Sequence, residues 1–92
     1  MAYSQQSQLL MACKRDRLDL VQKLLGEPSF VDPSFDNNRA LECCCENGRD
    51  KIAELLLTYP AVSFEGNSAL ELAKKYKNDR CIALASRVEQ SK

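Results

Sequence analysis

The chain lacks several residues on which common protein functions depend. It has 92 residues, with no histidine and no tryptophan, only three glycines and three prolines, and a formal net charge of zero. Without histidine, the usual general base of a hydrolase and the commonest metal ligand are missing. The zero net charge leaves no field to gather a nucleic-acid backbone. We therefore expect no catalytic activity, no metal or cofactor, and no nucleic-acid partner.

Long apolar runs and a secretory start are absent as well. No run approaches the roughly 20 apolar residues that a membrane-spanning helix needs. The start MAYSQQSQ lacks the charged and apolar regions of a secretory signal. The five cysteines are an odd number, and three of them are adjacent, which is unlike a secreted disulfide framework. We expect no membrane segment and a cytoplasmic location in a reducing compartment.

The residues that are present are typical of an ordinary folded chain. Hydrophobic residues make up 45% and charged residues 28%, as in soluble globular domains. The length suits one small domain, which we expect to span residues 1–92.

Three copies of one pattern fill the chain. The copies read LLMACKRDRLDLVQKLL from Leu9, LECCCENGRDKIAELLL from Leu41 and LELAKKYKNDRCIALAS from Leu70. The offsets between these leucines are 32 and 29 residues, which lie in the range of stacked helical arrays. The sequence therefore predicts three units, at approximately residues 7–38, 39–67 and 68–90.

Each unit is predicted to hold two short helices. Apolar residues recur at spacings of three and four, as in Ile52, Leu55 and Leu56, which gives each helix one buried stripe. The first helices are predicted over residues 7–14, 39–47 and 68–76, and the second over 17–25, 50–58 and 79–89. The expected fold class is all-α: a short solenoid of helix-turn-helix units joined by extended, hairpin-like loops.

Residues at the predicted helix ends agree with these bounds. Asn38 is predicted to cap the first helix of the central unit, and Ser68 with Glu71 matches a capping box. Gly48 suits the turn between two helices, where positive φ is favoured. The same place holds Asp16 in the first unit and Lys77 in the third. Lysine tolerates positive φ poorly, so we expect the third turn to be built differently.

Prolines and turn formers separate the units. Pro28, Pro33 and Pro60 forbid continuation of a helix, so we expect extended loops with little regular strand. Phe35 and Phe64 hold similar places in these two loops. They either fold back and seal the hydrophobic stack, or project as anchors for a partner.

The adjacent Cys43, Cys44 and Cys45 suggest a metal or redox site at first sight. Consecutive helical side chains, however, point about 100° apart and cannot converge on one ion. In the repeat register they take one leucine position and two small positions, so we interpret them as core packing. Cys13 shares a column with Cys45, but stacked helices lie about 8–10 Å apart, too far for a disulfide without backbone movement. We predict five free thiols.

This pattern resembles the ankyrin repeat, a unit of about 33 residues that pairs two antiparallel helices with a projecting hairpin loop. The resemblance covers about residues 7–87 and is carried by Leu41, Cys44, Cys45, Asn47, Gly48, Ile52, Leu55, Leu56 and Leu57. Arg39, Ala40 and Glu42 replace the Thr, Pro and His of the family's first turn, which removes the hydrogen bonds that tie its units together. The sequence DPSFDNNRAL, followed by ENG, is similar to divergent ankyrin repeats that are expanded in large viruses of amoebae and in some protists.

The resemblance implies a protein–protein interaction module whose concave face, made of first helices and loop tips, binds a protein partner. The expected contact residues share that face: Phe35, Asp36, Asn37, Arg39, Glu42, Glu46, Phe64, Glu65, Ser68, Glu71 and Lys75. Their acidic bias favours a partner with basic residues. For a viral or parasitic source, the expected partner is a host factor.

Two alternatives stay open. Apolar ends left uncovered by a three-unit stack would drive self-association, which is the structural alternative and makes the chain a monomer or a weak homo-oligomer. A nucleic-acid binder would use the mildly basic third unit, although a solvated helix face is the simpler reading and the zero net charge argues against such binding. The basic residues of that unit are Lys74, Lys75, Lys77, Arg80, Arg87 and Lys92.

Overall fold

The computed structural model describes residues 5–26 and 31–90, and within this part it is helical with short connections. Its helices are α1 (Gln5–Lys14), α2 (Leu18–Leu25), α3 (Phe35–Asn47), α4 (Asp50–Leu56), α5 (Ala69–Lys75) and α6 (Asp79–Gln90). Every helix expected from the apolar spacing is present, with ends that differ by a few residues. The expected all-α repeat fold is confirmed.

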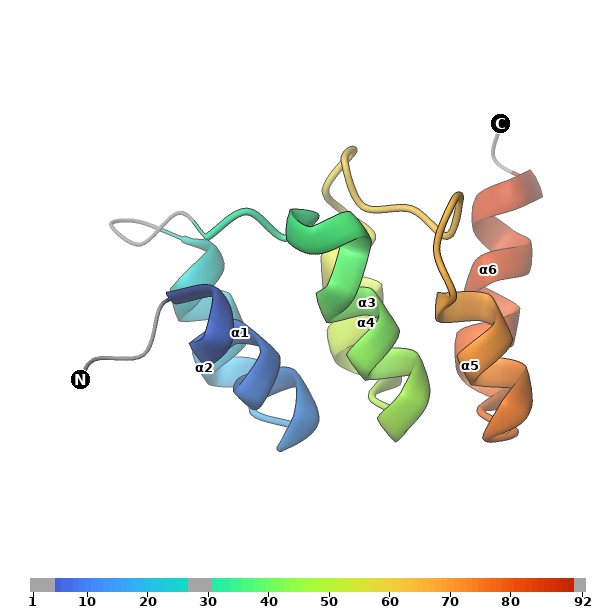
Figure 1. Ribbon diagram of the computed structural model, residues 1–92, viewed down its shortest axis with the longest axis horizontal. Coiled ribbons are helices and arrows are strands. Elements are labelled where there is room, and N and C mark those ends of the chain that lie inside the picture. Colours follow the sequence, from blue (N-terminus) through green and yellow to red (C-terminus); the bar gives the residue numbers. More distant parts are fainter. Residues whose placement is uncertain (1–4, 27–30, 91–92) are drawn as a thin grey trace.

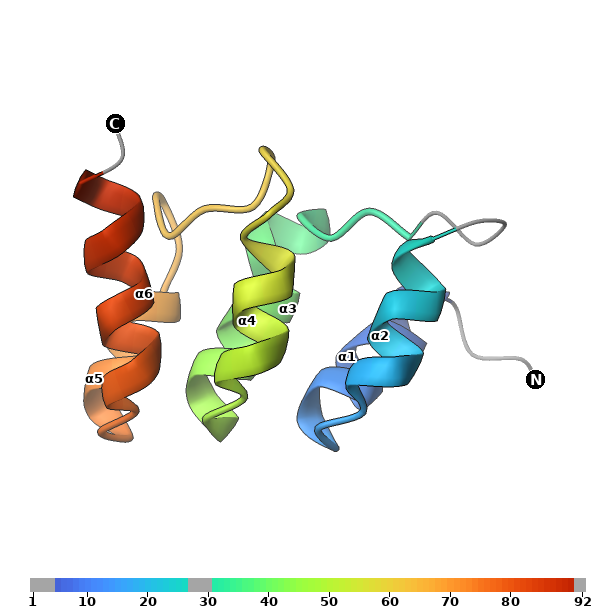
Figure 2. The ribbon, with the colours of Figure 1, turned by 180° about the vertical axis from the view of Figure 1, so that it is seen from behind.

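The helices form three antiparallel pairs that stand side by side along the longest dimension of a 38 × 26 × 22 Å molecule (Figure 1). The first helices α1, α3 and α5 form one layer, and α2, α4 and α6 form a second layer behind it (Figure 2). In the front layer α3 packs between α1 and α5, and in the rear layer α4 contacts both α2 and α6. The central pair is therefore the one with a helical neighbour on each side.

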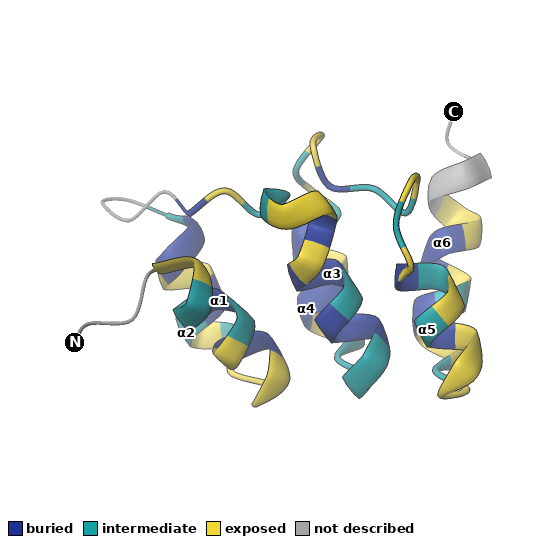
Figure 3. Cartoon of the chain, in the orientation of Figure 1, coloured by how far each residue is buried: buried dark blue, intermediate teal, exposed yellow. Residues whose placement is uncertain are grey.

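The core lies between the two layers and between neighbouring pairs, and the helices carry dark blue buried segments among exposed yellow ones in Figure 3. Two columns of the repeat are buried in all three pairs: Ala12, Cys44 and Ala73, and Leu24, Leu56 and Ala85. The largest side chains without solvent exposure are Leu9, Cys13, Val21, Leu41, Cys44, Cys45, Ile52, Leu56 and Cys81. The columns that align in the sequence therefore supply one continuous hydrophobic cluster.

The turn within each pair has the same construction in all three pairs. Its left-handed residue is Asp16 at φ 59°, Gly48 at φ 72° and Lys77 at φ 57°. The amide of the next residue donates to the carbonyl five positions earlier, at 2.8 Å, 2.9 Å and 2.8 Å respectively. The expectation of a different third turn is therefore wrong, because Lys77 adopts the left-handed conformation that the tertiary packing requires despite its Cβ.

The expected cap at Asn38 is also wrong. Asp36, Asn37 and Asn38 all have left-handed dihedral angles, so α3 begins with a kink at Phe35 and becomes regular only after Asn38. A capping residue needs an extended conformation to place its oxygen over the first amides. With φ at 66°, Asn38 instead turns its side chain inward, where its Oδ1 is buried and has no hydrogen-bond partner among the described residues.

At the start of α5 the boundary at Ser68 is right, but the expected capping box does not form. Ser68 makes no side-chain capping bond, and the Ala69 amide donates instead to Asn67 Oδ1 at 2.9 Å. The Ser68 amide donates to Glu42 Oε2 of α3 at 3.0 Å, so Glu42 takes the part expected of the exposed Glu71. A carboxylate from the neighbouring pair thus completes this helix end.

Side chains from the within-pair turns tie neighbouring pairs together. The Arg49 guanidinium donates to the Lys14 carbonyl, with its Nη2 at 2.9 Å. One pair further on, the equivalent residue Asn78 donates its amide to the Cys45 carbonyl. Both bonds satisfy carbonyls at the end of the preceding first helix, which have no intrahelical partner. They hold the stack together where the usual Thr and His of the resembled family are missing.

The two loops between pairs contain no strand among residues 31–34 and 57–68. Within these loops the side chains of Val31 and Val62 are buried. The Val31 amide donates to the Leu24 carbonyl at 3.0 Å. The loops thus fold back onto the layers that they connect. Pro28, expected to end a helix, and Lys92, expected in the basic set, lie outside the described residues.

Candidate functional site

The face formed by α1, α3 and α5, with the loop before α3 and the loop before α5, carries the residues expected to contact a partner. We call it the α1–α3–α5 face. It lies toward the viewer in Figure 1. Of the expected residues, Asp36, Asn37, Arg39, Glu65, Ser68, Glu71 and Lys75 are exposed, and Phe35, Glu42, Glu46 and Phe64 are partly buried. The expected set therefore contains both surface side chains and side chains used in packing.

Phe35 and Phe64 belong to the packing group. Both are partly buried and pack against the hydrophobic core from the two loops. Of the two alternatives for these rings, the structure shows the one in which they fold back onto the stack.

Asn37 links the two loops of this face. Its side-chain amide donates to the Gly66 carbonyl at 2.7 Å, across the top of the central and third pairs. Asn37 reaches this position because its backbone is left-handed, with φ at 55°, and Gly66 at φ 72° supplies the turn on the other side. Asn37 thus orders the loop tips, and the neighbouring Asp36 stays exposed beside it.

Glu42 is tied into the contact between α3 and α5. Its carboxylate accepts the Ser68 amide at 3.0 Å and lies 3.8 Å from Arg39 Nη1. The side chain of Glu42 is 15% exposed, whereas that of Arg39 is 46% exposed. Substitution of Glu42 would therefore disturb stacking as well as any binding, and Glu46 and Glu71 are the better carboxylates for testing contact with a partner.

A hollow of about 210 Å³ opens on the same face between α1 and α3. It is lined by Leu10, Met11, Lys14, Arg39, Cys43, Glu46 and Asn47. The α1 residues were not among those expected from the sequence. The repeat register did not point to them, because Met11 stands in the column of Cys43 and Leu72, and only the structure shows that Met11 is 36% exposed while Cys43 is 8% exposed.

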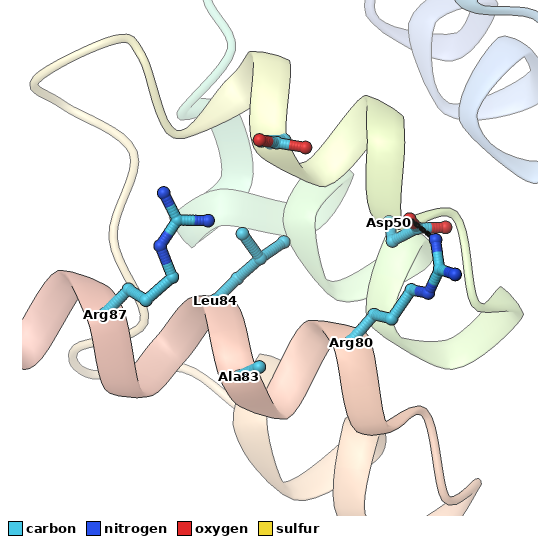
Figure 4. Close-up of a pocket in the computed structure, with 6 residues that line it drawn as sticks. Asp50, Arg80, Ala83, Leu84 and Arg87 are labelled. Carbon is cyan, nitrogen blue, oxygen red and sulfur yellow. Dashed lines mark hydrogen bonds and ion pairs between the residues drawn. The ribbon is translucent and has the colours of Figure 1, made fainter.

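A second hollow, of about 230 Å³, lies in the other layer between α4 and α6. Its lining is Asp50, Glu54, Arg80, Ala83, Leu84 and Arg87. In Figure 4 the two arginines extend from α6 on either side of Leu84, and Arg80 reaches Asp50 at 3.2 Å. Because Arg80 of α6 pairs with Asp50 of α4, the hollow lies at the contact between the central and third helix pairs.

The thiols behave as packing groups. All five cysteines are free and buried, which confirms the expectation from the repeat register. A hydrogen bond with Cys13 and burial hold the pKa of Cys44 well above its ordinary value. The hydrogen bond that Cys45 makes with Cys81, together with burial, raises the pKa of Cys45, and the same bond lowers the pKa of Cys81. Burial raises the pKa of Cys43 as well.

Neither a cluster of metal ligands nor a membrane-spanning helix occurs among the described residues. No group of three or more cysteine, aspartate or glutamate side chains in this part of the chain could hold a metal ion. None of the described helices combines the length and apolar character needed to cross a membrane.

Comparison with known proteins gives one match. A family model described as ankyrin repeats, in three copies, matches residues 9–90. No match was found to a curated protein or to a solved structure. The matched span runs from within α1 to the end of α6, and its three copies agree with the three helix pairs of the structure. The chain belongs to the ankyrin repeat family.

Proposed function

We propose that this chain is a non-catalytic protein-binding module that engages a protein partner through the α1–α3–α5 face. Ankyrin repeats are generally protein–protein interaction modules. The observation that carries the proposal for this face is the position of the exposed expected residues, which lie together on one side of the stack while the core is closed off between the layers. Such a rigid, side-chain-rich surface is what stacked repeats offer to a partner.

The charges of the face describe the partner in outline. Asp36, Glu65 and Glu71 are exposed around the loop tips and α5, and Glu46 is partly exposed on α3. A partner segment with basic residues would find complementary charge there, which favours rapid and selective association more than tight binding. A cytoplasmic location and a host factor as partner remain part of the proposal.

Affinity capture with matched variants tests the face. The wild-type chain, a variant with Glu46→Lys and Glu71→Lys, and a control with Lys23→Glu and Lys51→Glu would each be immobilised in an extract of the source cells. Both control lysines are exposed on the rear helices α2 and α4. We expect the face variant to lose specific partners that the control retains, as quantified by mass spectrometry. If both variants capture the wild-type set of proteins, partner binding does not use this face.

Self-association is the second candidate function, and the burial of one column favours it. Ile52 and Cys81 are fully buried in the central and third pairs, whereas Leu20, in the same column of the first pair, is partly exposed. Sedimentation velocity over a range of concentrations would detect dimers, and Leu20→Arg would abolish them. A single species of monomer mass at every concentration removes this candidate.

A further inference from the structure

The hollow between α1 and α3 differs in character from the rest of the α1–α3–α5 face. At about 210 Å³ it is smaller than the roughly 300–1,000 Å³ of small-molecule sites. It has the size of a socket for one side chain of a partner. Interfaces draw most of their affinity from a few such sockets, each filled by one anchoring side chain.

Three of the seven residues that line this socket are apolar. Met11 is 36% exposed and Leu10 is partly exposed, and both line the hollow from α1. Cys43, 8% exposed, contributes from α3, and burial keeps its thiol protonated by raising its pKa. Methionine adapts its shape to a partner at little cost, which suits an exposed apolar wall. An apolar side chain would therefore displace water from this socket favourably.

The rim of the socket carries more positive than negative charge. Lys14 of α1 is exposed and makes no ion pair within the described part of the chain. Arg39 of α3 is 46% exposed, and its guanidinium lies near the Glu42 carboxylate, which also accepts the Ser68 amide. Other N–H groups of this guanidinium therefore remain available to a partner. Glu46 is the one carboxylate in the lining. A carboxylate beside the anchoring side chain would meet both cations.

The equivalent positions between α3 and α5 have the opposite charge pattern. In the repeat register Leu10 and Lys14 correspond to Glu42 and Glu46, which replaces an apolar wall and a cation by two carboxylates. Arg39 corresponds to the uncharged Ser68 and Glu46 to Lys75, so two carboxylates and one cation stand where the socket has two cations and one carboxylate. The apolar, cation-rimmed socket therefore belongs to the first two pairs alone, and a bound segment would meet a positive rim there and negative charge further along the face.

We infer that the hollow between α1 and α3 is an anchor site for a protein segment that presents an apolar side chain next to an aspartate or glutamate. This inference rests on the proposed function and names the chemistry of the partner at one end of its contact. The apolar side chain enters between Met11 and Cys43, and the neighbouring carboxylate accepts hydrogen bonds from Lys14 and Arg39. Partner residues further along, opposite Glu71, are basic.

A random peptide library displayed on phage tests this without knowledge of the natural partner. Peptides would be selected on the wild-type chain and, separately, on Lys14→Glu. We expect the wild-type selection to converge on an apolar residue with Asp or Glu within two positions of it, and the Lys14→Glu selection to exchange that acidic residue for Lys or Arg. A synthetic peptide of the wild-type consensus should bind Met11→Asp and Lys14→Glu about tenfold or more weakly. Its affinity for Lys51→Glu, on the rear layer, should be unchanged.

The possible outcomes separate the two proposals. Circular dichroism would first verify that each variant is folded; both Met11 and Lys14 are exposed, so neither change touches the core. Selected peptides that lose affinity for Glu71→Lys but not for Met11→Asp or Lys14→Glu would overturn the anchor site and leave the proposed face intact. Peptides that respond only to Lys51→Glu, or a selection without any specific binder, would overturn both.

Discussion

The three within-pair turns offer a test of how the tertiary fold overrides local preference. Asp16, Gly48 and Lys77 occupy the same left-handed position with φ between 57° and 72°, yet only one of them is glycine. Exchanging residues at two of these places should therefore change stability in opposite directions. The two substitutions are Gly48→Ala and Lys77→Gly.

Gly48→Ala changes the free energy of unfolding in three ways, of which two lower it and one raises it. A left-handed conformation costs an L-residue about 1–2 kcal/mol. The new Cβ would stand 3.0 Å from Asn78 Oδ1, so the Asn78 side chain must shift and weaken its bond to the Cys45 carbonyl, at a cost of about 0.5–1.5 kcal/mol. The lower entropy of the unfolded chain returns about 0.4–1 kcal/mol. The free energy of unfolding should fall by roughly 0.5–3 kcal/mol.

Lys77→Gly should instead raise the free energy of unfolding. Removal of the Cβ relieves about 1–2 kcal/mol of left-handed strain, and the added backbone entropy of glycine costs about 0.5–1 kcal/mol. A net stabilisation of up to about 1 kcal/mol is expected. In a chain of this size, that raises the melting temperature by about 4–8 °C for each kcal/mol.

Urea unfolding followed by far-ultraviolet circular dichroism measures both changes. The slopes of the transitions should match that of the wild type, because neither substitution alters the buried surface. If Lys77→Gly lowers the midpoint, or if Gly48→Ala leaves it unchanged, the three turns do not share one strained conformation and the reasoning from φ is refuted.

Three further predictions concern the core, the thiols and the contact between α3 and α5. Leu56→Ala removes a side chain with 0% exposure from the centre of the stack and should lower the free energy of unfolding by about 2–5 kcal/mol; a loss below about 1 kcal/mol in urea would contradict its place in the core. The Cys13 bond and burial raise the folded pKa of Cys44, so its stabilisation is complete below the unfolded thiol pKa of about 8.5 and declines as pH rises above it. Stability measured at rising pH should fall, and less steeply in Cys44→Ala. Glu42→Ala should cost about 1–2 kcal/mol, and the exposed control Glu71→Ala less than about 0.5 kcal/mol; equal losses would contradict the bond to the Ser68 amide.

Local features made the architecture predictable. The apolar spacing within each helix and the recurrence of Leu9, Leu41 and Leu70 depend only on residues near one another or on a repeated register. The same register explained the cysteines, since Cys44 shares its column with the buried Ala12 and Ala73, and Cys45 shares its column with the buried Cys13. These statements held because each unit can bury its apolar stripe in one way only, against its neighbours.

The errors arose where a local rule competed with a distant contact. Asn38 has a good capping side chain, but three consecutive left-handed residues turn it into the core. Ser68 with Glu71 has the spacing of a capping box, but Glu42, 26 residues away, supplies the carboxylate. Lys77 is a poor left-handed residue, but packing of α5 against α6 requires that conformation.

The sequence by itself determined the number of helix pairs, the helix ends to within a few residues, and the burial of the five thiols, because periodicity and register are properties of short segments. Only the tertiary structure decided which groups meet across neighbouring pairs: the Arg49 and Asn78 bonds to preceding helix ends, the carboxylate of Glu42 at Ser68, and the socket between α1 and α3. These contacts join residues about 30 positions apart, and their geometry depends on how closely the helices approach. No local pattern in the chain encodes that distance.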